Sequence, residues 1–595
     1  MKKKQKEEIS IKRESLSKSK KILFWIFLTI FPLLILASIE IVLHLFNYDG
    51  SPKLFVSTPT EESKYFGINV DIGKRYFNSN AFVPTPRKDL FLKEKPENGY
   101  RLFVLGGSTA AGYPYGNNIT FPRILNRKLN DVFPEKHIEV INVAMTAINS
   151  YSLLDFIDEI NEQEPDAILI YAGHNEFYGA LGVSSMENLG RNRFFVKTIL
   201  QLQKFKTFIL LRKISKSIFG LFGSKEKING SEVMNETAMS AIVRDKEIAL
   251  NSEIYDLGNE QFRSNLIEIV ERFQNAGVKI LLSELVSNIK DQPPFESVNS
   301  DTNVVAGEVF KKAKKCEDDG EYLTARNLFN SAKDLDALRF RASDDFNKIV
   351  HEIGNFYNIP TVPLVSIFER NSPNELTGDN LMLDHLHPNI DGYFLMADGF
   401  FEQMRLNKFI VDKWPEQRIK PNHYYYTNWG VTEFDSVYAY LNILQLKGGW
   451  PFKKTGSNVA LKNFQPKTLV DSFAHDVTYL KKFTPEIAHI KLAKMFESEG
   501  QYKKSFMEHR ALIYTVPQLD IFYEPMIELF LKTNQYQTAF AILSEAVHFN
   551  DSPFICKWLG QFSLALDFTE NGIFYLEKSL ADNPKDIDVL FNLTR

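Results

Sequence analysis

Two short segments far apart in the sequence carry side chains that could act together in nucleophilic catalysis. The first, 106–109 (GGST), directly follows the apolar run 102–105 (LFVL), and the second is 384–388 (DHLHP). A serine hydroxyl is a weak nucleophile at neutral pH and needs an adjacent base, which itself needs a third group to orient it. The two segments contain a serine, an imidazole and a carboxylate. Together they predict a serine hydrolase or an acyltransferase.

The elements that must position these groups alternate between strands and helices. Apolar runs rich in β-branched residues predict strands at 101–105, 138–143, 167–171, 278–282 and 361–365, and helical periodicity predicts helices near 119–132, 150–162, 257–275 and 389–406. Such alternation favours a parallel sheet with helices on both faces. Ser108 would then stand at the carboxyl end of a strand, the edge at which open α/β sheets bind ligands.

Four blocks in chain order resemble those of the SGNH/GDSL hydrolases. They are Gly107-Ser108, where the family usually reads Gly-Asp-Ser, then 142–147 (NVAMTA), 173–176 (GHNE) and 384–388. The resemblance covers roughly 100–406 with its insertions. It implies a flavodoxin-like, three-layer α/β fold and an ester-bond hydrolase. The sequence contains no phosphate loop and no dinucleotide fingerprint, and no third cluster completes a set of metal ligands, so we expect no cofactor and no metal.

The resemblance also implies a role for each matching residue. Ser108 is then the nucleophile, His387 its general base and Asp384 the group that orients the imidazole. The side-chain amide of Asn175 and the backbone N–H groups of Ser108 and Ala147 would form the oxyanion hole.

Two positions depart from the family pattern. Gly107 stands where the family often has Asp, which removes a charge beside Ser108 but no member of the triad. Ala147 stands where the family usually has glycine. A backbone N–H survives that exchange, but an alanine is strained if the position requires a positive φ.

These residues also have structural alternatives. The segment 106–109 could be a turn and helix N-cap, because Ser and Thr favour helix starts, and Asn175 could cap the next helix. Asp384, His385 and His387 could be metal ligands, because His and carboxylate suit zinc.

Two arginines, Arg339 and Arg341, alternate with apolar residues after the second insertion. One of them could grip an anionic group in the pocket. Alternatively, they could form surface ion pairs with Asp334 or Asp336.

The N-terminal part predicts a membrane anchor. Residues 1–21 form a basic tail. Residues 22–39 carry no charge, and the apolar run continues past Glu40 to about Phe46, which is long enough to cross a bilayer. The positive-inside rule leaves the tail in the cytoplasm and the remainder outside, in a periplasm or at the cell surface. The alternative, a cleaved signal peptide, is disfavoured by the length of the apolar run.

The middle of the chain divides into a juxtamembrane segment at 47–99 and a catalytic domain at 100–410. We predict insertions into this domain at 180–255 and 300–338, the second a helical hairpin. In the first, 194–222 is apolar and basic without an acidic residue. That composition suits either a lid over the site or a helix lying on anionic lipid.

Downstream of a connector at 411–475, the sequence of 476–595 repeats with a period of 34 residues. Turn pairs at 501–502, 535–536 and 569–570 keep this phase. The period is typical of tetratricopeptide (TPR) helical hairpins. It predicts an all-α, TPR-like solenoid that either binds a protein partner or braces the catalytic domain.

Composition narrows the function further. A net charge of −4 over 595 residues gives no general field for nucleic acid, and two cysteines make no disulfide framework. We therefore predict a membrane-anchored, extracytoplasmic serine esterase that cleaves or transfers an O-linked acyl group on an envelope glycan or lipid. Two alternatives remain open: an O-acyltransferase with the same triad, and a non-catalytic assembly protein with a degenerate hydrolase domain.

Overall fold

The computed structural model describes residues 17–594, with gaps at 59–63, 78–82, 187–190, 223–237, 246, 299–304 and 454–457. The chain divides into two compact units. One comprises Met1–Ser51 and Lys197–Lys227, and the other Pro52–Val196 and Ile228–Arg595.

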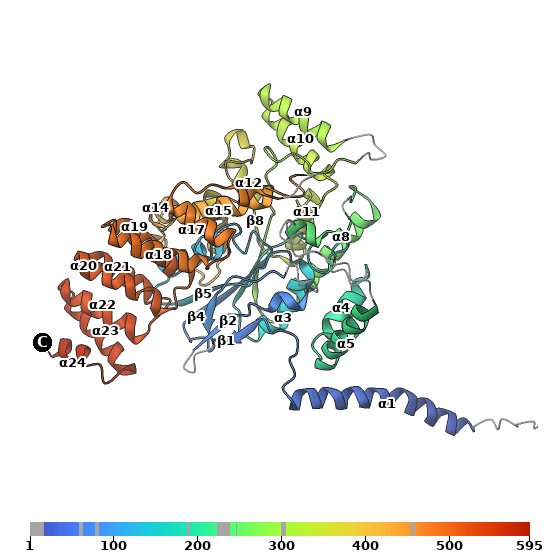
Figure 1. Ribbon diagram of the computed structural model, residues 1–595, viewed down its shortest axis with the longest axis horizontal. Helices are drawn as coiled ribbons and strands as arrows, with labels where there is room; N and C mark the ends of the chain where they lie inside the picture. The colour runs from blue at the N-terminus through green and yellow to red at the C-terminus, as the bar shows by residue number, and fades with distance from the viewer. Residues whose placement is uncertain are drawn as a thin grey trace, which may run out of the picture. The chain divides into compact units, whose positions relative to one another are not determined.

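The larger unit is built on a five-stranded parallel sheet (Figure 1). Its strands are β4 (Gly99–Gly106), β5 (His137–Asn142), β6 (Ala167–Tyr171), β7 (Lys279–Ser283) and β8 (Thr361–Val362), in the spatial order β5-β4-β6-β7-β8. Numbered along the chain this is 2-1-3-4-5, the flavodoxin-like order. The connections change direction between β4 and β6, so their carboxyl ends form the topological switch point at which such sheets bind ligands.

Helices cover both faces of this sheet. On one face α2 (Phe121–Val132) packs against α13 (Ile390–Leu406), and on the other α3 (Ser150–Asn161) packs against α8 (Glu253–Asn275). The β4 residues 102–105 lie between these layers and are fully buried, which is why this strand reads as a continuous apolar run. The predicted parallel α/β fold is confirmed.

One predicted strand is much shorter than expected. Only Thr361 and Val362 pair with β7, and α12 (Leu364–Arg370) begins directly after Pro363. Proline has no N–H to continue a ladder, and a short apolar run alone does not distinguish a strand from a buried helix.

The segments around this core form smaller elements. Residues 52–92 contain the antiparallel strands β1 (Phe55–Ser57), β2 (Tyr65–Ile68) and β3 (Leu90–Leu92). The two insertions contain α4 (Arg193–Leu202), α5 (Lys206–Phe222), α7 (Ala238–Ile242), α9 (Ala306–Asp318) and α10 (Tyr322–Leu335), and α11 (Asp344–Tyr357) follows. The helices α9 and α10 pack side by side, as the hairpin prediction requires.

The C-terminal part of the chain is helical. Its elements are α14 (Asn422–Asn428), α15 (Glu433–Lys447), α16 (Ala460–Asn463), α17 (Leu469–Thr478), α18 (Pro485–Ser498), α19 (Tyr502–Thr515), α20 (Glu524–Thr533), α21 (Tyr536–Ala546), α22 (Pro553–Ala565), α23 (Thr569–Asp582) and α24 (Ile587–Leu593). The expected connector at 411–475 contributes α14–α17. Phe434 of α15 shares a core with Val470 of α17 and Leu492 of α18, so the helical region starts well before residue 476.

Buried polar contacts join these helices to the α/β domain. Arg127 of α2 donates to the carboxylate of Glu545 at 3.0 Å, and the Trp429 indole donates to the carbonyl of Asn118 at 2.9 Å. Breaking such contacts would leave buried charges and donors unpaired, which is costly. The helical region is therefore an integral part of the larger unit.

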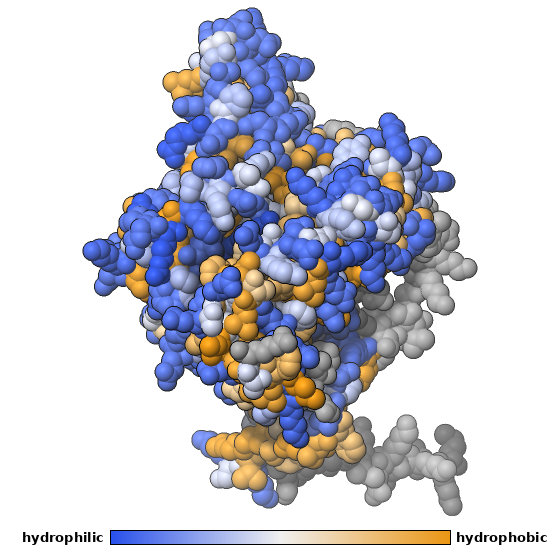
Figure 2. Space-filling model, turned by 90° about the vertical axis from the view of Figure 1, so that its left-hand side faces the viewer, coloured by the Kyte–Doolittle hydropathy of each residue, from blue (hydrophilic) through white to orange (hydrophobic). Residues whose placement is uncertain are grey.

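The smaller unit contains α1 (Lys18–Leu45), which is long and apolar enough to cross a membrane by length and composition. The face of α1 that is visible in Figure 2 is mostly hydrophobic. The Glu40 carboxylate accepts the backbone N–H groups of Lys206 at 2.9 Å and Thr207 at 2.7 Å, at the start of α5. A carboxylate at this place satisfies unpaired helix N–H groups and complements the helix dipole, so α5 begins against α1.

Candidate active site

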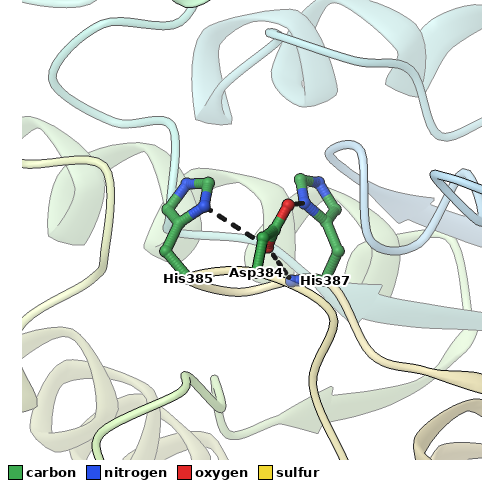
Figure 3. Close-up of side chains that lie close together, drawn as sticks. All are labelled: Asp384, His385 and His387. Carbon is green, nitrogen blue, oxygen red and sulfur yellow. Dashed lines mark hydrogen bonds and ion pairs between the residues drawn. The ribbon is translucent and has the colours of Figure 1, made fainter. Parts of the chain in front are cut away.

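Ser108 lies two residues after the end of β4, and its hydroxyl contacts the imidazole of His387. Ser108 Oγ lies 2.8 Å from His387 Nε2, and His387 Nδ1 lies 2.6 Å from Asp384 Oδ2. Figure 3 shows the Asp384 carboxylate between the rings of His385 and His387. The structure thus brings together the three residues that the sequence proposed as a triad.

The Asp384 carboxylate is fixed by its own loop. Its Oδ1 accepts the backbone N–H groups of Leu386 at 2.9 Å and His387 at 2.8 Å. Burial would raise the pKa of this carboxyl, but His387 and His385 beside it hold the pKa well below its ordinary value. An ionised Asp384 accepts the Nδ1–H of His387, which leaves Nε2 as the acceptor for the Ser108 hydroxyl.

The contacts of His387 disfavour the alternative of a metal site. Asp384, His385 and His387 lie close enough together to hold an ion. However, both ring nitrogens of His387 already contact Asp384 and Ser108. The arrangement favours proton transfer between Ser108 and His387.

The loop around Ser108 is a tight turn. The Ala111 N–H donates to the Gly107 carbonyl, and the Tyr113 N–H donates to the Ser108 carbonyl, both at 3.0 Å. The side chain of Thr120, rather than that of Ser108, caps α2. The N-cap alternative for Ser108 is therefore not observed.

The absence of a side chain at Gly107 has a direct steric reason. A Cβ built there would lie 2.6 Å from Asn175 Nδ2, which is closer than real side chains approach. An aspartate at this position would displace the Asn175 amide. The departure from the family pattern at Gly107 and the position of Asn175 are thus linked.

Asn175 follows β6, the neighbour of β4, and so stands across the switch point from Ser108. Both residues line one small cavity of about 10 Å³, which Asn149 also lines. In the described part of the chain the next helix after Asn175 is α4, which begins at Arg193, so Asn175 caps no neighbouring helix there.

Ala147 adopts the conformation that the sequence identified as problematic for alanine. Its φ is +60° and it is buried. Its carbonyl accepts the Ala180 N–H at 2.8 Å, which holds this backbone in place. A left-handed alanine costs about 1–2 kcal/mol, and strain of this kind gathers at functional sites.

We expect Ala147→Gly to raise the free energy of unfolding by up to about 1 kcal/mol, because relief of strain exceeds the entropic cost of glycine. The matched control is Ala144→Gly, at a buried alanine of the same loop without a positive φ. That variant should lose about 0.5–1 kcal/mol. Thermal unfolding of the two variants measures the difference, and equal losses would contradict the assigned strain.

Glu176 holds the start of α3 from across the site. Its carboxylate accepts the Ser150 N–H at 2.8 Å and the Ser150 hydroxyl at 2.7 Å, and Asn265 donates to the same hydroxyl at 2.9 Å. Burial raises the pKa of Glu176 to about 7, although the Ser150 hydrogen bonds oppose this. The sequence placed Glu176 in the third block but gave no sign of its partner, because Ser150 lies on another element.

Glu176 should make stability depend on pH. Its folded pKa of about 7 exceeds the unfolded value of 4.5, so its contribution is fully present below pH 4.5 and is lost as pH rises through 7. We therefore compare the free energies of unfolding of Glu176→Gln and wild type. Their difference should shift in favour of the variant by about 3 kcal/mol as the pH rises from 4 to 8.

Thermal unfolding across this pH range checks the expectation. The control is Glu139→Gln. Burial of Glu139 is outweighed by His137 and Arg101, which lower its pKa, so this variant should instead lose stability relative to wild type as pH rises. The same pH trend for both variants would contradict the assignment to Glu176.

Other polar residues near the site have structural partners. His174 Nδ1 accepts the Ala342 N–H at 3.1 Å, and burial lowers the His174 pKa to about 3, so its ring stays neutral. Arg341 pairs with Asp336 at 3.1 Å, but the pair is buried rather than at the surface. Arg339 is buried too and donates to the Ile248 carbonyl. Both arginines thus have main-chain or carboxylate partners within the fold.

Comparison with known families agrees with this geometry. Residues 104–395 match the model of the GDSL-like Lipase/Acylhydrolase family. The α/β domain is a GDSL-like lipase/acylhydrolase domain. The match includes Ser108, Asn175, Asp384 and His387, and it makes the domain a hydrolase of ester bonds.

Solved structures show only distant similarity to the whole chain. A catalytic mutant of the acetylxylan esterase Axe2 from Geobacillus stearothermophilus is 14% identical, with 53% of this chain and 96% of that chain covered and a TM-score of 0.26. A GDSL-like lipase from Bacteroides thetaiotaomicron is 10% identical, with 53% and 93% covered and a TM-score of 0.26. Scores this low support no conclusion about substrate. A comparison with curated proteins found no match.

Proposed function

We propose that the protein is a membrane-anchored serine esterase that removes an O-linked acyl group from an extracytoplasmic glycan or lipid. The observation that carries this proposal is the chain of contacts from Ser108 Oγ through His387 to Asp384, at 2.8 and 2.6 Å. It lies at the switch point of the sheet, where ligands of such folds bind. The ester-bond hydrolase class of the domain agrees with it.

Acylation begins when Ser108 Oγ attacks the carbonyl carbon of the ester and its proton moves to His387 Nε2. The imidazolium is stabilised by Asp384. The negative charge on the carbonyl oxygen is met by the Asn175 amide and by the backbone N–H of Ser108, with Ala147 as a further backbone donor. As the C–O bond breaks, His387 returns the proton to the leaving alcohol, which leaves the acyl group on Ser108.

Deacylation repeats these steps with a second nucleophile. Water attacks the carbonyl carbon of the Ser108 ester and gives a proton to His387 Nε2. As the bond between that carbon and Ser108 Oγ breaks, His387 returns the proton to Oγ and the carboxylic acid is released. A sugar hydroxyl in place of water would make the protein an O-acyltransferase with the same residues. We favour hydrolysis because the family consists of lipases and acylhydrolases.

Product analysis tests this choice. Full-length protein in detergent would be given p-nitrophenyl acetate with and without an oligosaccharide acceptor. An esterase releases acetate in step with nitrophenol in both cases. Nitrophenol release that requires the sugar, together with an acylated sugar product, would instead assign acyl transfer.

We also propose that α1 anchors the protein with the catalytic domain outside the membrane. The apolar length of α1 and the basic tail before it support this topology. Glu40 joins α1 to the start of α5, which favours membrane contact by 194–222 over a lid. Protease added outside sealed spheroplasts should digest the chain after residue 47 and spare the N-terminal tail, and digestion of the tail alone would reverse the topology.

The C-terminal helices are proposed to form TPR-like repeats that receive a protein partner. The helices α19, α21 and α23 begin at Tyr502, Tyr536 and Thr569, the positions of the repeated turns. The contact of Arg127 with Glu545 supports an additional bracing role. Removal of 502–595 spares the core that Phe434, Val470 and Leu492 share. Lower catalytic activity of this truncated protein would favour the brace, and unchanged activity would favour recruitment.

A further inference from the structure

One buried donor beside Ser108 has no assigned role. Asn149 is 3% exposed, and its Nδ2 has no hydrogen-bond partner among the described residues. A buried amide donor without a partner is destabilising, and an unsatisfied group in a folded protein needs an explanation. Asn149 lines the same cavity as Ser108 and Asn175, at the switch point where ligands of such sheets bind.

The orientation of the Asn149 amide is fixed by the hydrogen bond that its oxygen accepts. Asn149 Oδ1 accepts the Tyr151 N–H at 3.2 Å as the N-cap of α3. The oxygen of the amide is therefore committed to the helix, and Nδ2 must point elsewhere. The next residue, Ser150, is held by Glu176, and two residues earlier Ala147 keeps its strained φ of +60°.

The size of the cavity restricts what it can hold. Its volume of about 10 Å³ is close to that needed by one water molecule. A methyl group is of similar size, whereas each further methylene of an acyl chain would need additional space. Ile148 and Leu153 of the α3 side form part of its apolar wall.

We infer that this cavity takes the methyl group of an acetyl ester, and that Asn149 Nδ2 donates to the acyl carbonyl oxygen beside Asn175. The inference rests on the proposed serine esterase function and names its substrate class, an acetyl ester. Asn149 is thus a catalytic residue, since its amide contacts the oxygen that becomes negatively charged. Bound substrate would supply the acceptor that this donor lacks among the described residues.

Two substitutions separate the donor from the helix cap. Asn149→Ser keeps an N-cap oxygen and removes the amide, and Asn149→Asp keeps cap and shape but replaces the donor by an acceptor. Loss of one oxyanion donor typically lowers kcat by 10²- to 10³-fold. We expect kcat to fall by about 10²-fold or more in both variants, with KM nearly unchanged. Asn149→Ser should keep or gain thermal stability, because it removes a buried unpaired donor, whereas the buried carboxylate of Asn149→Asp should lower thermal stability. The control Asn130→Ser, at a buried amide of α2 that bonds Ile138, should lose stability and keep kcat.

The selectivity for acetyl over longer acyl groups is tested with p-nitrophenyl acetate and p-nitrophenyl butyrate on full-length protein in detergent. Wild type should prefer acetate, and Leu153→Ala, or the milder Ile148→Val, should raise the butyrate-to-acetate ratio of kcat/KM, by about tenfold for Leu153→Ala. Unchanged kcat in Asn149→Ser, or equal rates of wild type on both esters, would overturn the inference. Wild type no faster than Ser108→Ala on either ester would overturn the proposed function itself, and this inference with it.

Discussion

Replacement of Ser108 by alanine is expected to lower kcat for a short-chain chromogenic ester by a factor on the order of 10⁶. The substitution removes the atom that lies 2.8 Å from His387 Nε2 and leaves no group to form the acyl-enzyme. The Asn175 amide and the backbone donors remain, so a rate above that in water should persist. Ester hydrolysis by purified full-length protein in detergent measures the effect.

A matched serine elsewhere provides the control. Ser505 is fully buried in α19, away from the α/β sheet. Ser505→Ala should keep wild-type kcat. Equal activity of Ser108→Ala and wild type would remove the serine mechanism and favour another nucleophile. Absence of activity in both, with a partner still bound, would favour the non-catalytic assembly protein.

Asp384→Asn is expected to cost about 10⁴-fold in kcat. Asp384 Oδ1 accepts two backbone N–H groups, and Oδ2 faces His387 Nδ1 at 2.6 Å. An asparagine would keep its oxygen on the backbone donors and turn its NH₂ toward Nδ1. His387 would then carry its proton on Nε2 and be unable to accept from Ser108.

The comparison variant is His385→Gln. His385 Nδ1 lies 3.3 Å from Asp384 Oδ1 but does not contact Ser108 in the described hydrogen bonds. Steady-state kinetics should therefore show a much smaller loss than in Asp384→Asn. Losses of equal size, with activity restored by added zinc, would favour the metal alternative over the triad.

The sheet could be predicted from sequence because its central strands are buried on both faces. The runs at 102–105 and 167–171 are continuous apolar segments followed by glycine-containing turns, and both are strands in the structure. Less could be predicted where local pattern is ambiguous. The strand β8 is shorter than predicted because Pro363 follows it. The segment 411–475 belongs to the helical core rather than to a connector, because Phe434 and Val470 pack together in that core. Such contacts between distant residues form only when the chain folds.

The candidate site was predictable where its chemistry lies in short motifs. Ser108, Asp384 and His387 could be named from two segments, and the structure brings them within hydrogen-bonding distance. Asn149 and the partner of Glu176 could not be predicted, because both depend on contacts between separate elements. The sequence indicates that a positive φ would strain Ala147, but the value of φ, +60°, is known only from the structure.

The most direct test of the account is the chemical identity of the nucleophile. Full-length protein would be treated with a serine-directed fluorophosphonate, which forms an O–P bond and releases fluoride, and the modified peptide would be identified by mass spectrometry. The account predicts one adduct on Ser108 in wild type, none in Ser108→Ala, and greatly slowed labelling in His387→Ala. An adduct on another residue, or labelling of Ser108 that does not depend on His387, would contradict it.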